Sequence, residues 1–219
     1  MTNKIDIAIA GATGNVGREI LQILEQREFP INNIYCLASS RSKGKKIQFK
    51  EQEIIVENLS EFDFTKTQIC LFSPGSKISA EYVPEAARKD CIVIDNTSHF
   101  RMNDDVPLIV PEVNADILKD YFDDEDRSNI IANPNCSTIQ MVVALQPIHD
   151  AAIINRIVVS TYQSVSGAGK ENMDELWEQT KNIYANQNIE KKKFTKQIAF
   201  NVIPHIGSFL ENGDTKEEE

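Results

Sequence analysis

The chain has 219 residues, 41% of them hydrophobic, which is typical of a globular protein with one large domain or two small ones. Its formal net charge of −10 argues against nucleic acid and anionic membrane surfaces as partners, because most of the surface repels phosphate groups. The apolar run "IDIAIA" near the N-terminus is too short for a signal peptide or a membrane span, so we expect a cytoplasmic protein.

Residues 4–95 alternate short apolar runs with helical patterns. The runs predict strands at 5–10, 34–38, 68–72 and 91–95, with a small hairpin inserted between residues 47 and 57. Helices are predicted over 16–26 and 79–89, and Pro84 suggests that the second helix starts late or is kinked. One face of the first helix is predicted to hold Val16, Ile20, Leu21, Ile23 and Leu24. Alternating strands and helices predict a doubly wound parallel α/β sheet.

Beyond residue 95, "PLIVPEVN" and "NIIAN" predict two further strands, separated by an acidic surface turn or short helix. The pattern then changes to a long apolar helix from Ser137 to about Leu145, a strand over "RIVVSTYQSV", a turn with glycine, and an amphipathic helix near 170–185. We therefore place a domain boundary near Asn133, which gives a first domain of residues 1–133 and a second of residues 134–219.

The segment "GATGNVG" carries Gly11, Gly14 and Gly17 between the first strand and the first helix. A tight turn needs residues without Cβ, and a pyrophosphate can then accept hydrogen bonds from the free N–H groups of the helix N-terminus. The spacing G-x-x-G-x-x-G is a variant of the dinucleotide-binding fingerprint. The plainer alternative is a simple turn with a close helix contact.

The end of the second strand, "LASSRSKGKK", predicts which dinucleotide binds. An acidic residue here would bind the ribose 2′-hydroxyl of NAD, and none is present. Ser39, Arg41 and Ser42 instead offer hydroxyls and a guanidinium that suit a 2′-phosphate, which favours NADP. A solvated basic loop would explain the neighbouring lysines equally well, but it leaves the missing acid unexplained.

Cys136 in "NPNCST" stands where a predicted strand ends and a helix begins. A helix N-terminus stabilises a thiolate, which is the nucleophilic form of cysteine. In the plainer alternative, Asn135 or Ser137 caps the helix and Cys136 packs beneath it. After a dinucleotide domain, the pattern favours oxidation of an aldehyde through a thiohemiacetal and a thioester. The other three cysteines lie in apolar runs, where a thiol behaves as a small hydrophobe: Cys36, Cys70 and Cys91.

This chemistry needs a base, usually a histidine. The chain has three histidines. His149 lies at a predicted helix end and suits a capping or surface role, whereas His99 and His205 are conceivable partners of the thiol. The sequence alone does not identify the base.

With "GATGNVG", "DNTSHFR", "VPEVN", "NPNCSTIQM" and "STYQSVSGAG" in this order, the chain resembles aspartate-semialdehyde dehydrogenase from about Lys4 to its C-terminus. Related reductases of N-acetylglutamyl phosphate have a similar fold but a different cysteine motif. The resemblance implies a Rossmann-type NADP domain, and a second α/β domain that forms the interface of a homodimer or higher oligomer. It implies reversible, phosphate-dependent interconversion of aspartate semialdehyde and aspartyl phosphate, in the biosynthesis of lysine and diaminopimelate, methionine and threonine.

The resemblance also implies roles for individual residues. Cys136 would form the acyl-enzyme, Asn135 would orient the acyl oxygen, Arg101 would bind the phosphate or acyl phosphate, and Gln163 would position the substrate near the thiol. No metal site is predicted. Cofactor contacts are predicted for Gly11, Thr13, Gly14, Asn15, Val16, Gly17, Ser39, Arg41, Ser42, Ser73, Gly75, Asn96, Ser166 and Gly167.

In the family, the catalytic histidine and further substrate contacts come later than the last residue of this chain. We therefore expect the chain to correspond to the first three-fifths of the enzyme, with an incomplete second domain and exposed apolar surface. Three hypotheses stay open at this point. The chain is the nucleophile and cofactor half of the dehydrogenase, inactive or nearly so by itself; or a non-catalytic NADP-binding or dimerising fragment; or a related reductase that recruits its own histidine for another aldehyde or acyl phosphate.

Overall fold

The computed structural model describes residues 4–215 and forms two compact units, Met1–Val159 and Ser160–Glu219. The strands of the first unit are β1 (Ile5–Ala10), β2 (Ile31–Ala38), β3 (Lys46–Phe49), β4 (Gln52–Ile55), β5 (Glu57–Asn58), β6 (Ile69–Phe72), β7 (Ile92–Asp95) and β8 (Ile130–Ala132). Its α-helices are α1 (Asn15–Gln26), α2 (Ser76–Ala87), α3 (Pro111–Asn114), α4 (Ile117–Asp123) and α5 (Cys136–Ala152). The domain boundary expected near Asn133 stays a prediction.

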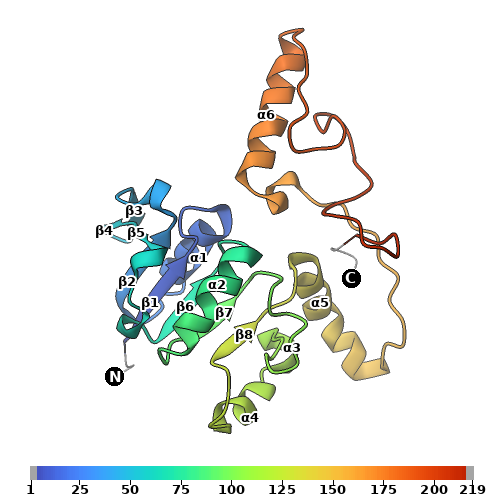
Figure 1. Cartoon of the computed structure of the whole chain (residues 1–219). Helices are drawn as coiled ribbons and strands as arrows, with labels where there is room; N and C mark the ends of the chain where they lie inside the picture. Colours follow the sequence, from blue (N-terminus) through green and yellow to red (C-terminus); the bar gives the residue numbers. More distant parts are fainter. Residues whose placement is uncertain (1–3, 216–219) are drawn as a thin grey trace. The chain divides into compact units, whose positions relative to one another are not determined.

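Six strands of the first unit form one parallel sheet in the order β5-β2-β1-β6-β7-β8 (Figure 1). From β1 the chain runs outward through β2 to β5, then returns to β6 on the other side of β1 and continues to β8. Parallel neighbours need crossover connections, and α1 and α2 supply two of them. The predicted doubly wound α/β sheet of Rossmann type is confirmed, and so is the hairpin, formed by the antiparallel pair β3 and β4.

Apolar side chains cover both faces of the sheet, because successive residues of a strand point to opposite sides. Ile7 of β1 packs in one buried cluster with Leu21 of α1. Its neighbour Ala8 packs in the other cluster with Val83 of α2. The predicted apolar face of α1 is correct for Leu21 and its neighbours but wrong for Val16 and Ile23, which are 44% and 39% exposed.

The structure corrects two predictions near prolines, although the alternative of a kink at Pro84 stays a prediction. The expected strand over residues 107–114 is only one isolated bridge, from Leu108 to Ala132, and Pro111 then begins α3. Proline fits the first position of a helix because its missing N–H would be unpaired there anyway. The second helix does not start late: α2 begins at Ser76 and continues past Pro84.

The segment after β8 departs most from expectation. The predicted helix is longer than expected, because α5 continues through Pro147 to Ala152, and none of its residues is buried. The predicted strand over residues 156–165 is irregular, with Val158 82% and Tyr162 89% exposed. A strand needs a neighbour to pair its backbone groups, and none lies beside these residues in the described part of the chain. The expected exposed apolar surface is present here.

The second unit contains a 3₁₀ turn, η4 (Val165–Ala168), and the helix α6 (Lys170–Tyr184), which confirms the predicted amphipathic helix. The buried residues of α6 are polar: Glu175 and Gln179. Their side chains hydrogen-bond to backbone groups of the segment that follows, at Glu190, Lys192, Lys193, Ile198 and Ala199. Directional hydrogen bonds therefore hold this segment against α6.

Candidate active site

Four segments that follow parallel strands meet at the carboxyl edge of the sheet. Strand order reverses between β1 and β6, and open α/β sheets bind ligands in the crevice at this point. Backbone hydrogen bonds carry the strand alignment into the segments, from Gly11 N to Leu37 O (2.9 Å), Ser73 N to Ala10 O (3.0 Å), Asn96 N to Phe72 O (2.9 Å) and Asn133 N to Asp95 O (3.2 Å). The edge therefore gathers the predicted glycine turn, Ser73, Asn96 and the segment before Cys136.

The glycine turn requires glycine for two separate reasons. Gly11 has φ +85°, a left-handed conformation that favours glycine. A Cβ on Gly17 would clash with the carbonyl oxygen of Gly11 and come within 2.7 Å of Ala12 Cα, so α1 approaches the turn closely. Gly14 caps α1 without a side-chain hydrogen bond, and no acidic residue occupies the first turn. Gly14 thus offers no side chain to cap the start of α1.

A second turn, between β6 and α2, packs against the first. A Cβ on Gly11 would come within 3.0 Å of Ser73 and Pro74. Ser73 donates a hydrogen bond from Oγ to the carbonyl of Ala10 (3.2 Å). Gly75, with φ +102°, caps α2. The structure thus brings two predicted cofactor segments together. A helix begins directly after each segment: α1 after the glycine turn and α2 after the second turn.

The basic loop after β2 contains a cation without a partner. Arg41 is exposed and makes no hydrogen bond or ion pair within residues 4–215. The nearby lysines are occupied, because Lys43 pairs with a carboxylate, that of Glu61, and Lys45 donates to the buried Ser42 Oγ (3.2 Å). Arg41 and the exposed hydroxyl of Ser39 are therefore the groups of this loop that suit an anionic ligand.

Cys136 is exposed and is the first residue of the 17-residue helix α5. Asn135 caps the helix, since its Oδ1 accepts a hydrogen bond from Thr138 N (2.8 Å). The alternative reading is correct that Asn135 caps the helix, but it is wrong that the thiol packs beneath it. The other cysteines are buried as expected, and burial raises the pKa of all three, to about 11 for Cys36.

Arg101 links the segment after β7 to the segment before Cys136. Its Nε donates to the carbonyl of Asn133 (2.9 Å) and its Nη2 donates to the carbonyl of Asn96 (3.1 Å). The side chains of these two asparagines also bond, from Asn133 Nδ2 to Asn96 Oδ1 (2.7 Å). The guanidinium is thereby fixed at the carboxyl edge. One of its partners, Asn133, is three residues before Cys136 in the sequence.

The histidines have other contacts. The His99 ring lies edge-on to Phe100, and His149 Nδ1 accepts a hydrogen bond from Ile154 N (3.2 Å) in the last turn of α5. Neither ring bonds to Cys136 in the described part of the unit. His205, in the second unit, lies 3.4 Å from Thr195 Oγ1. The suggestion that His149 lies at a helix end is correct, and no base is assigned by these contacts.

Three predicted residues lie in the second unit, around η4. Ser166 N–H and Oγ both donate to Ser164 Oγ, at 3.4 and 3.1 Å, and Gly167 N donates to the Ser164 carbonyl (3.1 Å). Gln163 directly precedes this turn and is half-buried. The three residues are close in sequence and share one turn, and their roles stay predictions.

Sequence reasoning missed the most buried polar group of the edge, Asp95. Its side chain is fully buried and accepts hydrogen bonds from Ser79 Oγ (3.0 Å), Thr97 N (3.0 Å) and Thr97 Oγ1 (2.8 Å). An acidic residue directly after the apolar run "IVI" was the available signal. Asn133 was also missed as a side-chain partner, because its contact depends on the pairing of β7 with β8.

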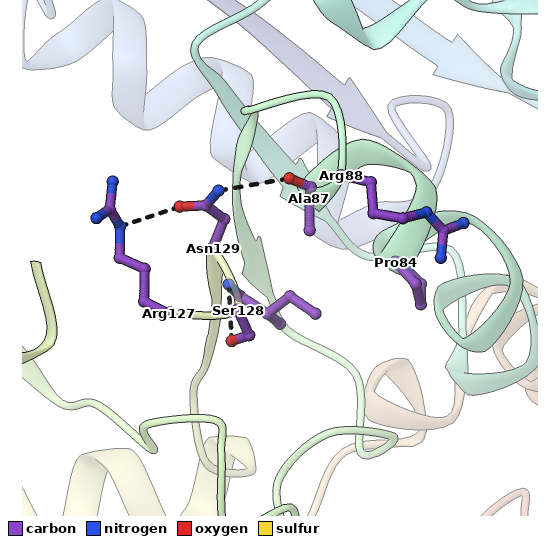
Figure 2. Close-up of a pocket in the computed structure, with 7 residues that line it drawn as sticks. Pro84, Ala87, Arg88, Arg127, Ser128 and Asn129 are labelled. Carbon is purple, nitrogen blue, oxygen red and sulfur yellow. Dashed lines mark hydrogen bonds between the residues drawn. The ribbon is translucent and has the colours of Figure 1, made fainter. Parts of the chain in front are cut away.

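A pocket of about 320 Å³ lies at the opposite end of β8. Figure 2 shows Arg127 turned toward Asn129, with Nε donating to Oδ1 (3.1 Å), whereas Arg88 extends away on the other side. The pocket is lined by Pro84, Ala87, Arg88, Arg127, Ser128, Asn129 and Ile130. Arg127 is hydrogen-bonded to residues of its own loop, and Arg88 points away. The side chains of this pocket therefore do not point toward one common ligand position.

Two further observations concern residues 4–215. No group of histidine, cysteine and acidic side chains there could hold a metal ion. No helix in this range is long and apolar enough to cross a membrane.

The chain matches known proteins along its whole length. Residues 6–121 match the family described as "Semialdehyde dehydrogenase, NAD binding domain", and residues 145–219 match "Semialdehyde dehydrogenase, dimerisation domain". The chain is 51% identical over 218 residues to aspartate-semialdehyde dehydrogenase of Rickettsia bellii, and 50% identical to that of Vibrio mimicus. These alignments cover all of this chain, but 63% and 68% of the two relatives.

A solved structure is similar in the same way. The crystal structure of aspartate semialdehyde dehydrogenase II from Vibrio cholerae, complexed with ASA, matches with a TM-score of 0.94 and 51% identity. The match covers 99% of this chain and 63% of that chain. The sequence thus spans a little under two thirds of the length of this relative.

Proposed function

The chain belongs to the aspartate-semialdehyde dehydrogenase family, and from that premise we propose that it carries the dinucleotide site and the cysteine nucleophile of that enzyme. In the proposed reaction, the Cys136 thiolate attacks the acyl carbon of 4-phospho-L-aspartate, a C–S bond forms, and phosphate leaves with the electrons of the C–O bond. Reduction of the resulting thioester to L-aspartate 4-semialdehyde would use a hydride that bound NADPH would supply, and the C–S bond would break to release the Cys136 thiolate. In the reverse direction, phosphate cleaves the thioester.

The placement of Cys136 is the observation that carries the proposal. Its thiol is exposed at the first position of α5, where the helix dipole stabilises an anion. Arg101 is hydrogen-bonded to Asn133, which is three residues before Cys136 in the sequence. A guanidinium forms strong charge-assisted hydrogen bonds with phosphate oxygens, so the arrangement suits a thiolate that attacks an acyl phosphate.

Two amides have proposed roles in the reaction. Asn135 Oδ1 is engaged in capping α5, so its Nδ2 is the group that would donate to the acyl oxygen. Gln163, in the second unit, would position the substrate. The substrate assignment is supported by the Vibrio cholerae relative, which is complexed with ASA.

NADP is the proposed cofactor, and Arg41, which has no partner among residues 4–215, is the group proposed to bind its 2′-phosphate. Replacement of Arg41 by Ala should raise the dissociation constant of NADP by about tenfold and leave that of NAD unchanged, because only NADP carries the phosphate. Isothermal titration with both dinucleotides measures this. Lys46→Ala is the control, because Lys46 already pairs with Glu53. Equal weakening of both dinucleotides would contradict the role of Arg41.

The proposed assembly is a homodimer or higher homo-oligomer in the cytoplasm. The match of residues 145–219 to a dimerisation domain supports it. The exposed apolar residues of the first unit also support it, because patches of this kind mark interaction surfaces.

A non-catalytic NADP-binding or dimerising fragment is the second candidate. It is favoured by the contacts of His99 and His149, neither of which places a base at the thiol. A third reading, a related acyl-phosphate reductase with its own base, predicts sustained turnover that is lost in His99→Asn or His205→Asn.

Release of phosphate from 4-phospho-L-aspartate separates these readings. We expect a burst of about one phosphate per chain, followed by little turnover, because acylation needs only the thiolate and the later steps need a base. Cys136→Ser should abolish the burst. A folded chain that binds NADP and releases no phosphate would instead support the non-catalytic fragment.

A further inference from the structure

Asp95 is a buried acidic side chain that the proposed reaction does not use. It ends β7 at the carboxyl edge, and no part of it is exposed to solvent. Burial of a carboxylate costs free energy unless hydrogen bonds compensate, and the three bonds to Asp95 come from neutral groups of Ser79 and Thr97. Two of the three come from the loop that leads to Arg101. The free-energy cost of burying the Asp95 carboxylate, and its bonds to this loop, suggest that it has a role in the site.

The peptide group between Asn96 and Thr97 connects Asp95 to Arg101. Its N–H donates to Asp95 Oδ1 (3.0 Å), and its C=O accepts from Arg101 Nη2 (3.1 Å). Because a peptide group is planar and its N–H and C=O point in opposite directions, fixing one end fixes the direction of the other. Asp95 on one side therefore determines where the carbonyl points on the other.

The same loop is attached at two further points. Ser98 Oγ lies 2.8 Å from Ser76 Oγ, at the start of α2. The Asn96 side chain accepts from Asn133 Nδ2 (2.7 Å), just before the nucleophile segment. The loop thus joins the turn at α2 to the segment of Cys136, and Asp95 anchors it to the sheet.

We propose that Asp95 is a positioning residue: it orients the Asn96–Thr97 peptide so that its carbonyl holds the Arg101 guanidinium beside the Cys136 segment. The functional consequence, tighter binding of phosphate or an acyl phosphate, rests on the proposed function. The positioning itself is independent of it. Ser79, on α2, bonds to Asp95 but not to the loop, so its hydroxyl contributes to the core without orienting Arg101.

Exchange of the Arg101 Nε–H with solvent, followed by NMR, tests the positioning. In Asp95→Ala this exchange should become about tenfold faster, because the Asn96 carbonyl that accepts from Nη2 is no longer held in direction and the guanidinium becomes more mobile. Asp95→Asn keeps an oxygen for Thr97 N–H and should restore slow exchange. Arg101→Lys identifies the signal, and the Nε–H of Arg127, which bonds to Asn129 at the other end of β8, is the internal reference (Figure 2).

Ser79→Ala is the matched control for a purely structural role. It removes a buried hydrogen bond to the same carboxylate, so it should lower stability while leaving Arg101 exchange unchanged. If Asp95→Ala does not fold, Thr97→Val is the second test. It keeps the bond from Thr97 N to Asp95 and removes the hydroxyl that donates to Asp95 Oδ2 (2.8 Å) and accepts from His99 N (3.4 Å), so it should give a smaller acceleration. Unchanged Arg101 exchange in a folded Asp95→Ala or Thr97→Val chain overturns the proposal, as does rapid exchange in the original chain.

A second measurement connects positioning to ligand binding. Inorganic phosphate should protect Cys136 from iodoacetamide, and the half-protecting concentration should rise about tenfold in Asp95→Ala but not in Asp95→Asn or Ser79→Ala. If phosphate does not protect the original chain while Arg101 exchange responds as expected, the proposed function fails and the positioning role of Asp95 stands. The two failures are therefore distinguishable.

Discussion

The two units of the chain are stabilised by different kinds of buried side chain. In Met1–Val159, apolar residues fill both faces of a six-stranded sheet. In the described part of Ser160–Glu219, the buried residues are Glu175, Gln179, Ala199 and Thr215. Apolar packing depends on shape and volume, whereas the contacts of Glu175 and Gln179 depend on individual hydrogen bonds. The first unit should therefore respond most to steric changes, and the second to the loss of single polar groups.

Gly17→Ala should have the largest effect, and it acts on the first unit. A Cβ at this position clashes with the Gly11 carbonyl and Ala12, which are backbone atoms that cannot move aside. We expect a loss of about 3–5 kcal/mol in the free energy of unfolding, measured by urea denaturation. Gly167→Ala is the control in the second unit, because a Cβ there meets nothing within 4 Å. Equal stability of the two variants would contradict the close packing of α1.

Gln179→Leu should loosen the second unit without affecting the first. The leucine fills a similar volume but leaves the N–H groups of Ile198 and Ala199 without their acceptor, at a cost of about 2–4 kcal/mol. Hydrogen exchange resolved by peptide should show faster exchange over residues 190–199 and no change in β1. Asn182→Ala removes a half-buried amide from the same helix, which makes one long bond to the Asn188 carbonyl (3.3 Å), and should have a smaller effect. Faster exchange in β1 would show that the units do not respond separately.

Cys36 gives the first unit a pH dependence that the second unit, which contains no cysteine, does not share. Burial raises the pKa of Cys36 from 9.0 to about 11. Below pH 9 the thiol is protonated in both states; between the two values the unfolded chain loses the proton and the folded chain keeps it, so stability falls as pH rises. Between pH 8.5 and 10.5, we expect the free energy of unfolding of Cys36→Ala to fall by about 2 kcal/mol less than that of the original chain. Parallel unfolding curves of both chains at pH 8.5 and 10.5 measure it, and identical slopes would contradict the burial of the thiol.

The sequence predicted the elements whose pattern is local. Apolar runs located β1 and β6, and helical periodicity located α6, because each pattern reflects one buried face. The strand predicted over 156–165 failed for a physical reason: β-branched residues favour an extended chain, but only a neighbouring strand completes the hydrogen bonds. Pro111 shows the same limit, since proline permits either a strand end or a helix start.

The candidate site divides in the same way. Gly11, Gly17 and Cys136 were identified because a strand-to-helix turn has a short sequence signature. The contacts of Asp95 and Asn133 could not be identified, because they form only when β7 and β8 align at one edge. Local signatures therefore located the groups proposed to react, and the three-dimensional structure was needed to find the contacts around them.

Peptide-resolved mass spectrometry of the chain after reaction with 4-phospho-L-aspartate tests whether Cys136 is the nucleophile. We expect an aspartyl adduct on the peptide that contains Cys136 and none on the peptides of Cys36, Cys70 and Cys91, which are buried. Cys136→Ser should carry no adduct. The absence of an adduct on Cys136 in a folded chain, or its presence on a buried cysteine, would contradict the assignment of the nucleophile.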